Sequence, residues 1–146
     1  MNEVVELRRW HQRAQIDYKY HYMGLYAAFN AWYRLTTGAH NDREALNKLR
    51  MGNVTWEQYC RGRTMRELAQ YMNMLVECTQ REPISHTTPH WNGEVAHTKD
   101  WPSVVEYWYR VRCLVMHGAE IRSVYVYLAY ETLNIFMTEV ITQKHY

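Results

Sequence analysis

The chain has 146 residues, with 17 Lys and Arg against 15 Asp and Glu and a formal net charge of +2 at pH 7. A chain of this length is typical of one domain with its own core, and the near balance of charges argues against a protein that coats nucleic acid by electrostatics alone. Its three cysteines form no Cys-x-x-Cys pair, which favours reduced thiols, and no window is apolar enough to span a membrane. We therefore expect a single cytoplasmic domain over residues 1–146 with no membrane segment.

Tyrosine, tryptophan and arginine dominate the aromatic and cationic residues. The chain has 13 Tyr and 6 Trp, and 13 of its 17 cations are Arg. Tyr and Trp suit interfaces because one end of the ring stays dry while the other contacts water. Arg suits phosphates and carboxylates better than Lys does, because its planar guanidinium can donate two parallel hydrogen bonds to them. The composition favours a homodimer, and the net charge near zero restricts any contact with RNA or DNA to a local site.

Apolar residues recur at helical spacing from residue 3 to residue 36. Their steps of four and three predict one long helix, or two joined by a bend, that ends at Gly38. The stepping is clearest at Tyr18, Tyr22, Leu25, Phe29, Trp32 and Thr36. Shorter helices are predicted over residues 42–51 and 65–80.

The pattern Ser/Thr/Asn-x-x-Glu/Gln, which is typical of helix N-termini, recurs along the chain. It occurs at Asn41 with Glu44, Thr55 with Gln58, Thr64 with Glu67, and Ser103 with Glu106.

Residues 82–102 interrupt the helical periodicity with three prolines and an Asn-Gly pair. We expect one long, mobile loop here, in which His86, His90 and His97 are solvated and bind no metal. Helices resume over 104–117, ending at Gly118, and over 124–143. With no alternating strand pattern, the sequence predicts an all-α bundle of four main helices plus short helices.

The most specific motif lies in residues 107–119, where Arg112 precedes His117 by five positions at the predicted end of a helix. A second motif, Phe-Asn-x-x-Tyr, occupies residues 29–33. Together they resemble the HEPN family, the "higher eukaryotes and prokaryotes nucleotide-binding" domains. These domains are small α-helical bundles in which an Arg is followed by four to six residues and a His.

This resemblance implies a metal-independent endoribonuclease of a prokaryotic defence or toxin kind, with no cofactor. In such members two protomers bring their Arg and His together across a two-fold axis. RNA would be the substrate, and an antitoxin or a nucleotidyltransferase a possible partner. His117 would act as general acid or base and Arg112 would stabilise the charge that grows on the phosphorane. Further substrate-binding candidates are Asn30, Tyr33, Arg110 and Cys113.

Three points leave an alternative open. Arg112 and His117 lie about 140° apart on an ideal helix, so they converge only if the helix unwinds at its end or a partner protomer supplies one of them. Cys113 replaces the polar residue that is common after the arginine in active members. A structural ion pair of Arg112 with Glu106 or Glu120, with His117 as a helix C-cap, would instead fit a catalytically silent nucleotide- or partner-binding module.

Overall fold

The computed structural model describes residues 2–14, 17–52, 55–84 and 90–146. The expected all-α architecture is confirmed, and the described residues form seven helices. They are α1 (Glu3–Ala14), α2 (Tyr18–Thr37), α3 (Asp42–Met51), α4 (Thr55–Tyr59), α5 (Gly62–Arg81), α6 (Trp101–Met116) and α7 (Ser123–Lys144). None of these helices combines the length and the apolarity that a membrane span requires.

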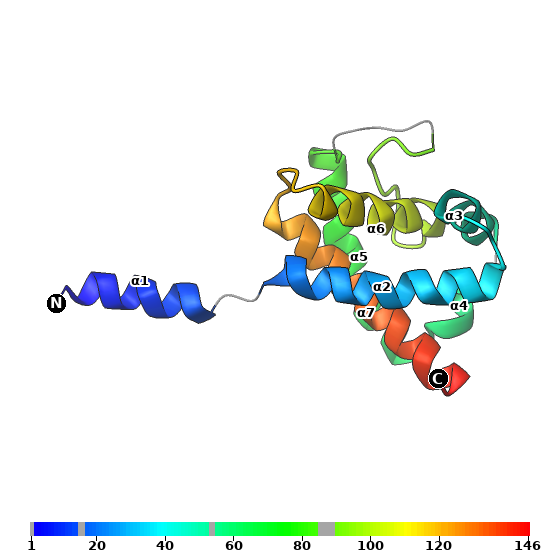
Figure 1. Cartoon of the computed structure of the whole chain (residues 1–146), viewed down its shortest axis with the longest axis horizontal. Coiled ribbons are helices and arrows are strands. Elements are labelled where there is room, and N and C mark those ends of the chain that lie inside the picture. Colours follow the sequence, from blue (N-terminus) through cyan, green and yellow to red (C-terminus); the bar gives the residue numbers. More distant parts are fainter. Residues whose placement is uncertain (1, 15–16, 53–54, 85–89) are drawn as a thin grey trace.

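The four long helices α2, α5, α6 and α7 build the bundle (Figure 1). α7 packs against α2, α5 and α6, while the shorter α3 lies against α2 and α6. Of the two predicted alternatives for residues 3–36, the structure has two helices, and the Asp17 carboxylate caps α2 by accepting the Tyr20 N–H at 3.2 Å. α1 then extends away from the bundle (Figure 1), and Leu7 and Trp10 are more than 60% exposed.

Aromatic rings from α2, α6 and α7 form the centre of the core. Phe29, Trp108 and Phe136 are fully buried, and their ring centroids lie 5.3 to 6.4 Å apart. Their polar neighbours are paired: the Trp108 indole donates to Thr132 Oγ1 at 2.9 Å, and the Tyr22 hydroxyl donates to the Trp108 carbonyl at 2.6 Å. The predicted stripe thus supplies the core, and the polar atoms of Tyr22 and Trp108 at its centre are hydrogen-bonded.

The predicted helix caps are correct in part. Asn41 caps α3 by accepting the Glu44 N–H at 2.9 Å. Thr64 is not a cap, because α5 begins at Gly62 and the Thr64 hydroxyl donates to Glu139. Ser103 is not a cap either, because Asp100 caps α6. The cap at residue 55 concerns a side chain outside the described residues.

Residues 90–100, which are the longer described part of the predicted loop, pack onto the bundle. Trp91 and Val95 are buried, and the Val95 N–H donates to Thr79 Oγ1 of α5 at 3.0 Å. Gly93 has a φ of 90°, and a Cβ there would lie 2.6 Å from the Ile84 carbonyl oxygen. The segment is therefore anchored by its apolar residues. His86 lies outside the described residues.

Candidate functional site

Arg112 lies on α6 with its guanidinium held between aromatic rings. Its Cζ atom is 5.6 Å from the centroid of the Tyr26 ring and 6.0 Å from that of Tyr109, which are cation–π distances. The side chain is half-buried. Burial acts to lower the pKa of Arg112, but its hydrogen bond with Cys113 and the coulombic effects of Tyr26 and Asp42 raise that pKa above the ordinary value. The guanidinium of Arg112 therefore stays positively charged although it is partly shielded from water.

The structural ion pair that the sequence allowed for Arg112 is absent from the described residues. Glu106 is buried and binds Arg43 and Arg50 of α3 instead, at 2.5 Å and 3.3 Å. Glu120 is exposed and forms no ion pair with Arg112 among these residues. The charge of Arg112 thus has no carboxylate partner in the described part of the chain.

His117 is exposed and is the C-cap of α6. The helix stays wound to its end, because the His117 N–H donates to the Cys113 carbonyl at 3.0 Å. Gly118 then adopts a φ of 66°. The Gly118 N–H donates to Val115 and the Ala119 N–H donates to Leu114, which is the Schellman arrangement. The expected C-cap position is confirmed, and the helix does not unwind to bring His117 to Arg112 within one chain.

Asn30 and Tyr33 join a polar network with Asp42, a residue that the sequence reasoning missed. The Asn30 amide donates to the Tyr33 hydroxyl at 2.6 Å and to Asp42 Oδ1 at 3.0 Å. Arg34 donates to the same carboxylate oxygen at 3.1 Å. Burial acts to raise the pKa of Asp42, but hydrogen bonds from Tyr33, Arg34 and Asn30 lower it below the ordinary value. The amide of Asn30 is thus committed to side chains, and not to a backbone group.

This network reaches the ring that contacts Arg112. The Tyr26 and Tyr33 hydroxyls lie 3.3 Å apart, and burial raises the pKa of Tyr33 to about 12. Both phenols are therefore neutral hydrogen-bonding groups at neutral pH. Tyr26 could have been found from the sequence, since it lies four residues before Asn30 on the same helical face.

Of the two remaining candidates, Cys113 lies beside Arg112 and Arg110 does not join the network. Cys113 is half-buried and interacts with Arg112 and Tyr109. Arg110 is half-buried as well, but no ion pair or hydrogen bond ties it to the network within the described residues. Arg43 also contacts Tyr109, with its Cζ atom 5.6 Å from the ring centroid. The structure thus places Asn30, Tyr33, Cys113 and Arg112 around Tyr26 and Tyr109, and leaves Arg110 apart.

The chemistry open to this arrangement is charge stabilisation by a guanidinium and proton transfer by an exposed imidazole. Among the residues that the structure describes, no three His, Cys, Asp or Glu side chains are grouped so that they could hold a metal ion. Comparison of the chain with family models, curated proteins and solved structures finds no significant match.

Proposed function

We propose that the chain is a metal-independent endoribonuclease of the HEPN type, of a prokaryotic defence or toxin kind, that acts as a homodimer. The observation that carries the proposal is Arg112. Its half-buried guanidinium has no carboxylate partner in the described residues and lies on the helix that ends at the exposed His117. An arginine that receives a phosphate must keep its donors available, and Arg112, held between the Tyr26 and Tyr109 rings, fits this requirement.

In the proposed reaction the 2′-oxygen of one nucleotide attacks the adjacent phosphorus and the bond to the 5′-oxygen breaks. The products are a 2′,3′-cyclic phosphate and a new 5′-hydroxyl. His117 takes the proton from the 2′-hydroxyl or donates one to the leaving oxygen. Arg112 stabilises the negative charge that grows on the phosphorane oxygens.

The geometry of α6 supports the proposed dimer. Because the helix stays wound to His117, Arg112 and His117 of one chain lie about 140° apart around its axis. A two-fold axis near the C-terminal end of α6 would let one protomer supply Arg112 and its partner supply His117.

The first experiment is cleavage of a labelled RNA in EDTA, with the cyclic phosphate as the diagnostic product. Arg112→Ala and His117→Ala should each reduce the rate by roughly 10²- to 10⁴-fold, while the melting temperature stays within a few degrees. His145→Ala is the matched control, because His145 is also an exposed helix C-cap. Cleavage that survives both variants would place the active site elsewhere.

Mixing the two inactive variants tests whether the site is shared. If each site takes Arg112 from one protomer and His117 from the other, a mixed dimer keeps one intact site of its two. Random exchange makes about half of the dimers mixed, so activity should return to roughly a quarter of the wild-type value. No recovery, or a monomer in light scattering, would contradict the shared site.

The second candidate function is a catalytically silent module that binds a nucleotide or a partner such as an antitoxin or a nucleotidyltransferase. The observation that favours it is Cys113, whose thiol sits beside Arg112 where a more polar side chain would assist catalysis. A wild-type protein that binds RNA or nucleotide but never cuts RNA would support this second function.

A further inference from the structure

Arg43 of α3 and Arg112 of α6 contact the same aromatic ring. Their Cζ atoms lie 5.6 Å and 6.0 Å from the centroid of the Tyr109 ring. Tyr109 belongs to a row on α6 in which Glu106, Tyr109 and Arg112 follow one another at intervals of three residues, so that successive members are neighbours on the helix surface. Glu106 binds Arg43 at one end of this row, and Arg112 lies at the other end. RNA cleavage as proposed above uses Arg112 and assigns no role to Arg43.

Arg43 is held by Glu106 but keeps part of its guanidinium available. Its Nη1 donates to Glu106 Oε1 at 2.5 Å and to Asn47 Oδ1 at 3.4 Å, and its Nη2 donates to Glu106 Oε2 at 3.2 Å. A guanidinium has five N–H donors, so the donor on Nε and the second donor on Nη2 have no partner among the described residues. The side chain is 31% exposed, and its Nε is not one of the buried unpaired atoms, so a ligand can reach it. Donors on adjacent nitrogens can bind two oxygens of one phosphate.

The charges around this row favour an anionic ligand. Arg43 shares its carboxylate partner with Arg50, which leaves one positive charge in excess. Arg112 adds a second positive charge, because it forms no ion pair in the described part of the chain. The carboxylate of Asp42 also acts on Arg112, but it is already paired with Arg34 at 3.0 Å. The guanidiniums therefore outnumber the carboxylates in this network.

From these observations we infer that Arg43 is a second phosphate-binding residue of the RNA site and holds a phosphate next to the one at Arg112. This inference rests on the proposed function, because it takes RNA as the ligand. Glu106, which holds Arg43, and Arg112 are separated by about 9 Å along the axis of α6. A single phosphate group is too small to span this separation. The two guanidiniums therefore bind different phosphates of one strand that runs along α6.

Oligonucleotides that cannot be cut measure how many phosphates the protein binds. A 2′-O-methyl dinucleotide without terminal phosphates carries one phosphate, and the corresponding trinucleotide carries two. Wild-type protein should bind the trinucleotide roughly tenfold or more tightly than the dinucleotide, because hydrogen bonds to charged groups contribute strongly. Arg43→Gln should remove this advantage and leave the Kd for the dinucleotide within about twofold of the wild-type value. If Arg43→Gln does not fold, Arg43→Lys replaces it, since it keeps the positive charge beside Glu106 but loses the planar pair of donors.

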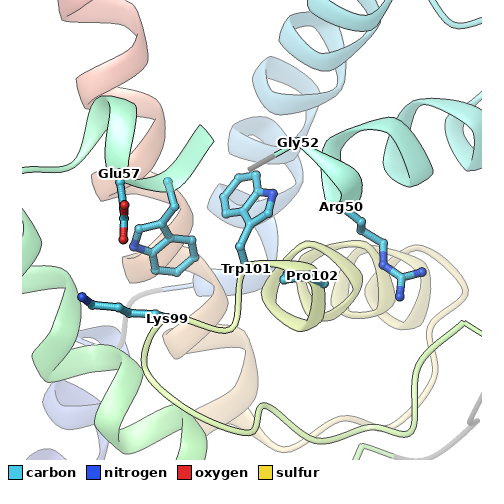
Figure 2. Close-up of a pocket in the computed structure, with 7 residues that line it drawn as sticks. Arg50, Gly52, Glu57, Lys99, Trp101 and Pro102 are labelled. Atoms are coloured by element: carbon cyan, nitrogen blue, oxygen red, sulfur yellow. The ribbon is translucent and has the colours of Figure 1, made fainter. Parts of the chain in front are cut away.

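Arg50→Gln is the matched control. Arg50 binds the same Glu106 carboxylate at 3.3 Å, but it lies beside Pro102 at the start of α6 (Figure 2), and the described residues show no contact between it and the Tyr109 ring. Arg50→Gln should therefore keep the advantage of the trinucleotide. Salt dependence gives a second measurement: the slope of log K against log salt for the trinucleotide should fall by about 0.7 in Arg43→Gln and stay unchanged in Arg50→Gln.

Several results would overturn the inference. They are a trinucleotide that binds no better than the dinucleotide, equal losses in Arg43→Gln and Arg50→Gln, and a matching loss of dinucleotide binding in Arg43→Gln, which would mean that both arginines hold one phosphate. Adenosine diphosphate tests the other source of two linked phosphates. If it binds more tightly than the trinucleotide and depends on Arg43, the assignment to RNA is wrong.

These measurements need no cleavage, so the two proposals can fail separately. If the ribonuclease proposal fails, Arg43 can still distinguish the trinucleotide from the dinucleotide. Conversely, RNA can be cut through Arg112 and His117 while the Arg43 and Arg50 variants bind alike, and the role of Arg43 alone is then refuted.

Discussion

Replacing Glu106 with Gln tests the tertiary contact that separates Arg112 from its expected ion pair. The Glu106 side chain is 2% exposed and lies between Arg43 and Arg50, whose side chains are 31% and 27% exposed. Glutamine keeps the shape of the side chain but removes the charge that both guanidiniums share. The substitution also turns one acceptor oxygen into an amide donor that faces other donors.

The burial of the Glu106 side chain determines how much free energy of unfolding the Glu106→Gln variant should lose. Removing one partner of a buried ion pair destabilises a protein by about 3–5 kcal/mol, but here water reaches part of each guanidinium and reduces this to about 2–3 kcal/mol. With an unfolding entropy of about 2.1 cal/mol/K per residue, a chain of 146 residues should lose about 6–10 °C in melting temperature.

Thermal unfolding followed by circular dichroism at pH 7 measures this loss. Glu82→Gln is the control, because Glu82 pairs with Arg122 and both side chains are more than half exposed; it should cost less than about 1 kcal/mol. A double-mutant cycle should show strong coupling of Glu106 with Arg43 and less than about 0.5 kcal/mol with Arg112. A loss below about 2 °C for Glu106→Gln, or strong coupling with Arg112, would refute the reasoning.

Three further predictions concern stability. A variant that begins at Asp17 should melt within about 2 °C of the full chain, because α1 makes no extended contact with another described helix; a larger loss in calorimetry would contradict this. Thr132→Val should cost about 1–3 kcal/mol in chemical unfolding, because it leaves the buried Trp108 indole without its acceptor; an unchanged midpoint would argue against that hydrogen bond. The lowered pKa of Asp42 stabilises the fold above about pH 4, where the unfolded carboxyl ionises, and this stability is lost as pH falls through the folded pKa. Asp42→Asn should therefore lose stability at pH 7 and show less further loss on acidification to pH 3, and an unchanged acid titration of stability would count against the network.

Local signals in the sequence account for most of the secondary structure. The periodicity of residues 18–36 predicts α2 and its buried face, of which Tyr22, Phe29 and Trp32 are buried in the structure. Gly38 and Gly118 end α2 and α6 as expected, since glycine adopts a positive φ without strain. These features depend on residues within a few positions of one another, which is why a single sequence suffices to find them.

Glu106 shows where such reasoning fails. Its spacing from Ser103 is typical of a capping box, yet Asp100 caps the helix and Glu106 is buried against Arg43, 63 residues away in the sequence. A capping side chain and a buried ion-pair partner require the same residue type. Only the packing of α3 on α6 decides between them.

The sequence by itself determined the long helices, the ends of α2 and α6 at Gly38 and Gly118, and the position of His117 at a helix C-terminus, because each depends on backbone preferences and hydrogen bonds within one or two turns. Only the tertiary structure decided that Arg112 faces Tyr26 with no carboxylate partner among the described residues, that Asp42 joins Asn30 and Tyr33, and that Glu106 binds Arg43 and Arg50. These contacts join helices far apart in the chain. Their partners are selected by packing and by the cost of burying unpaired polar groups, which no local pattern encodes.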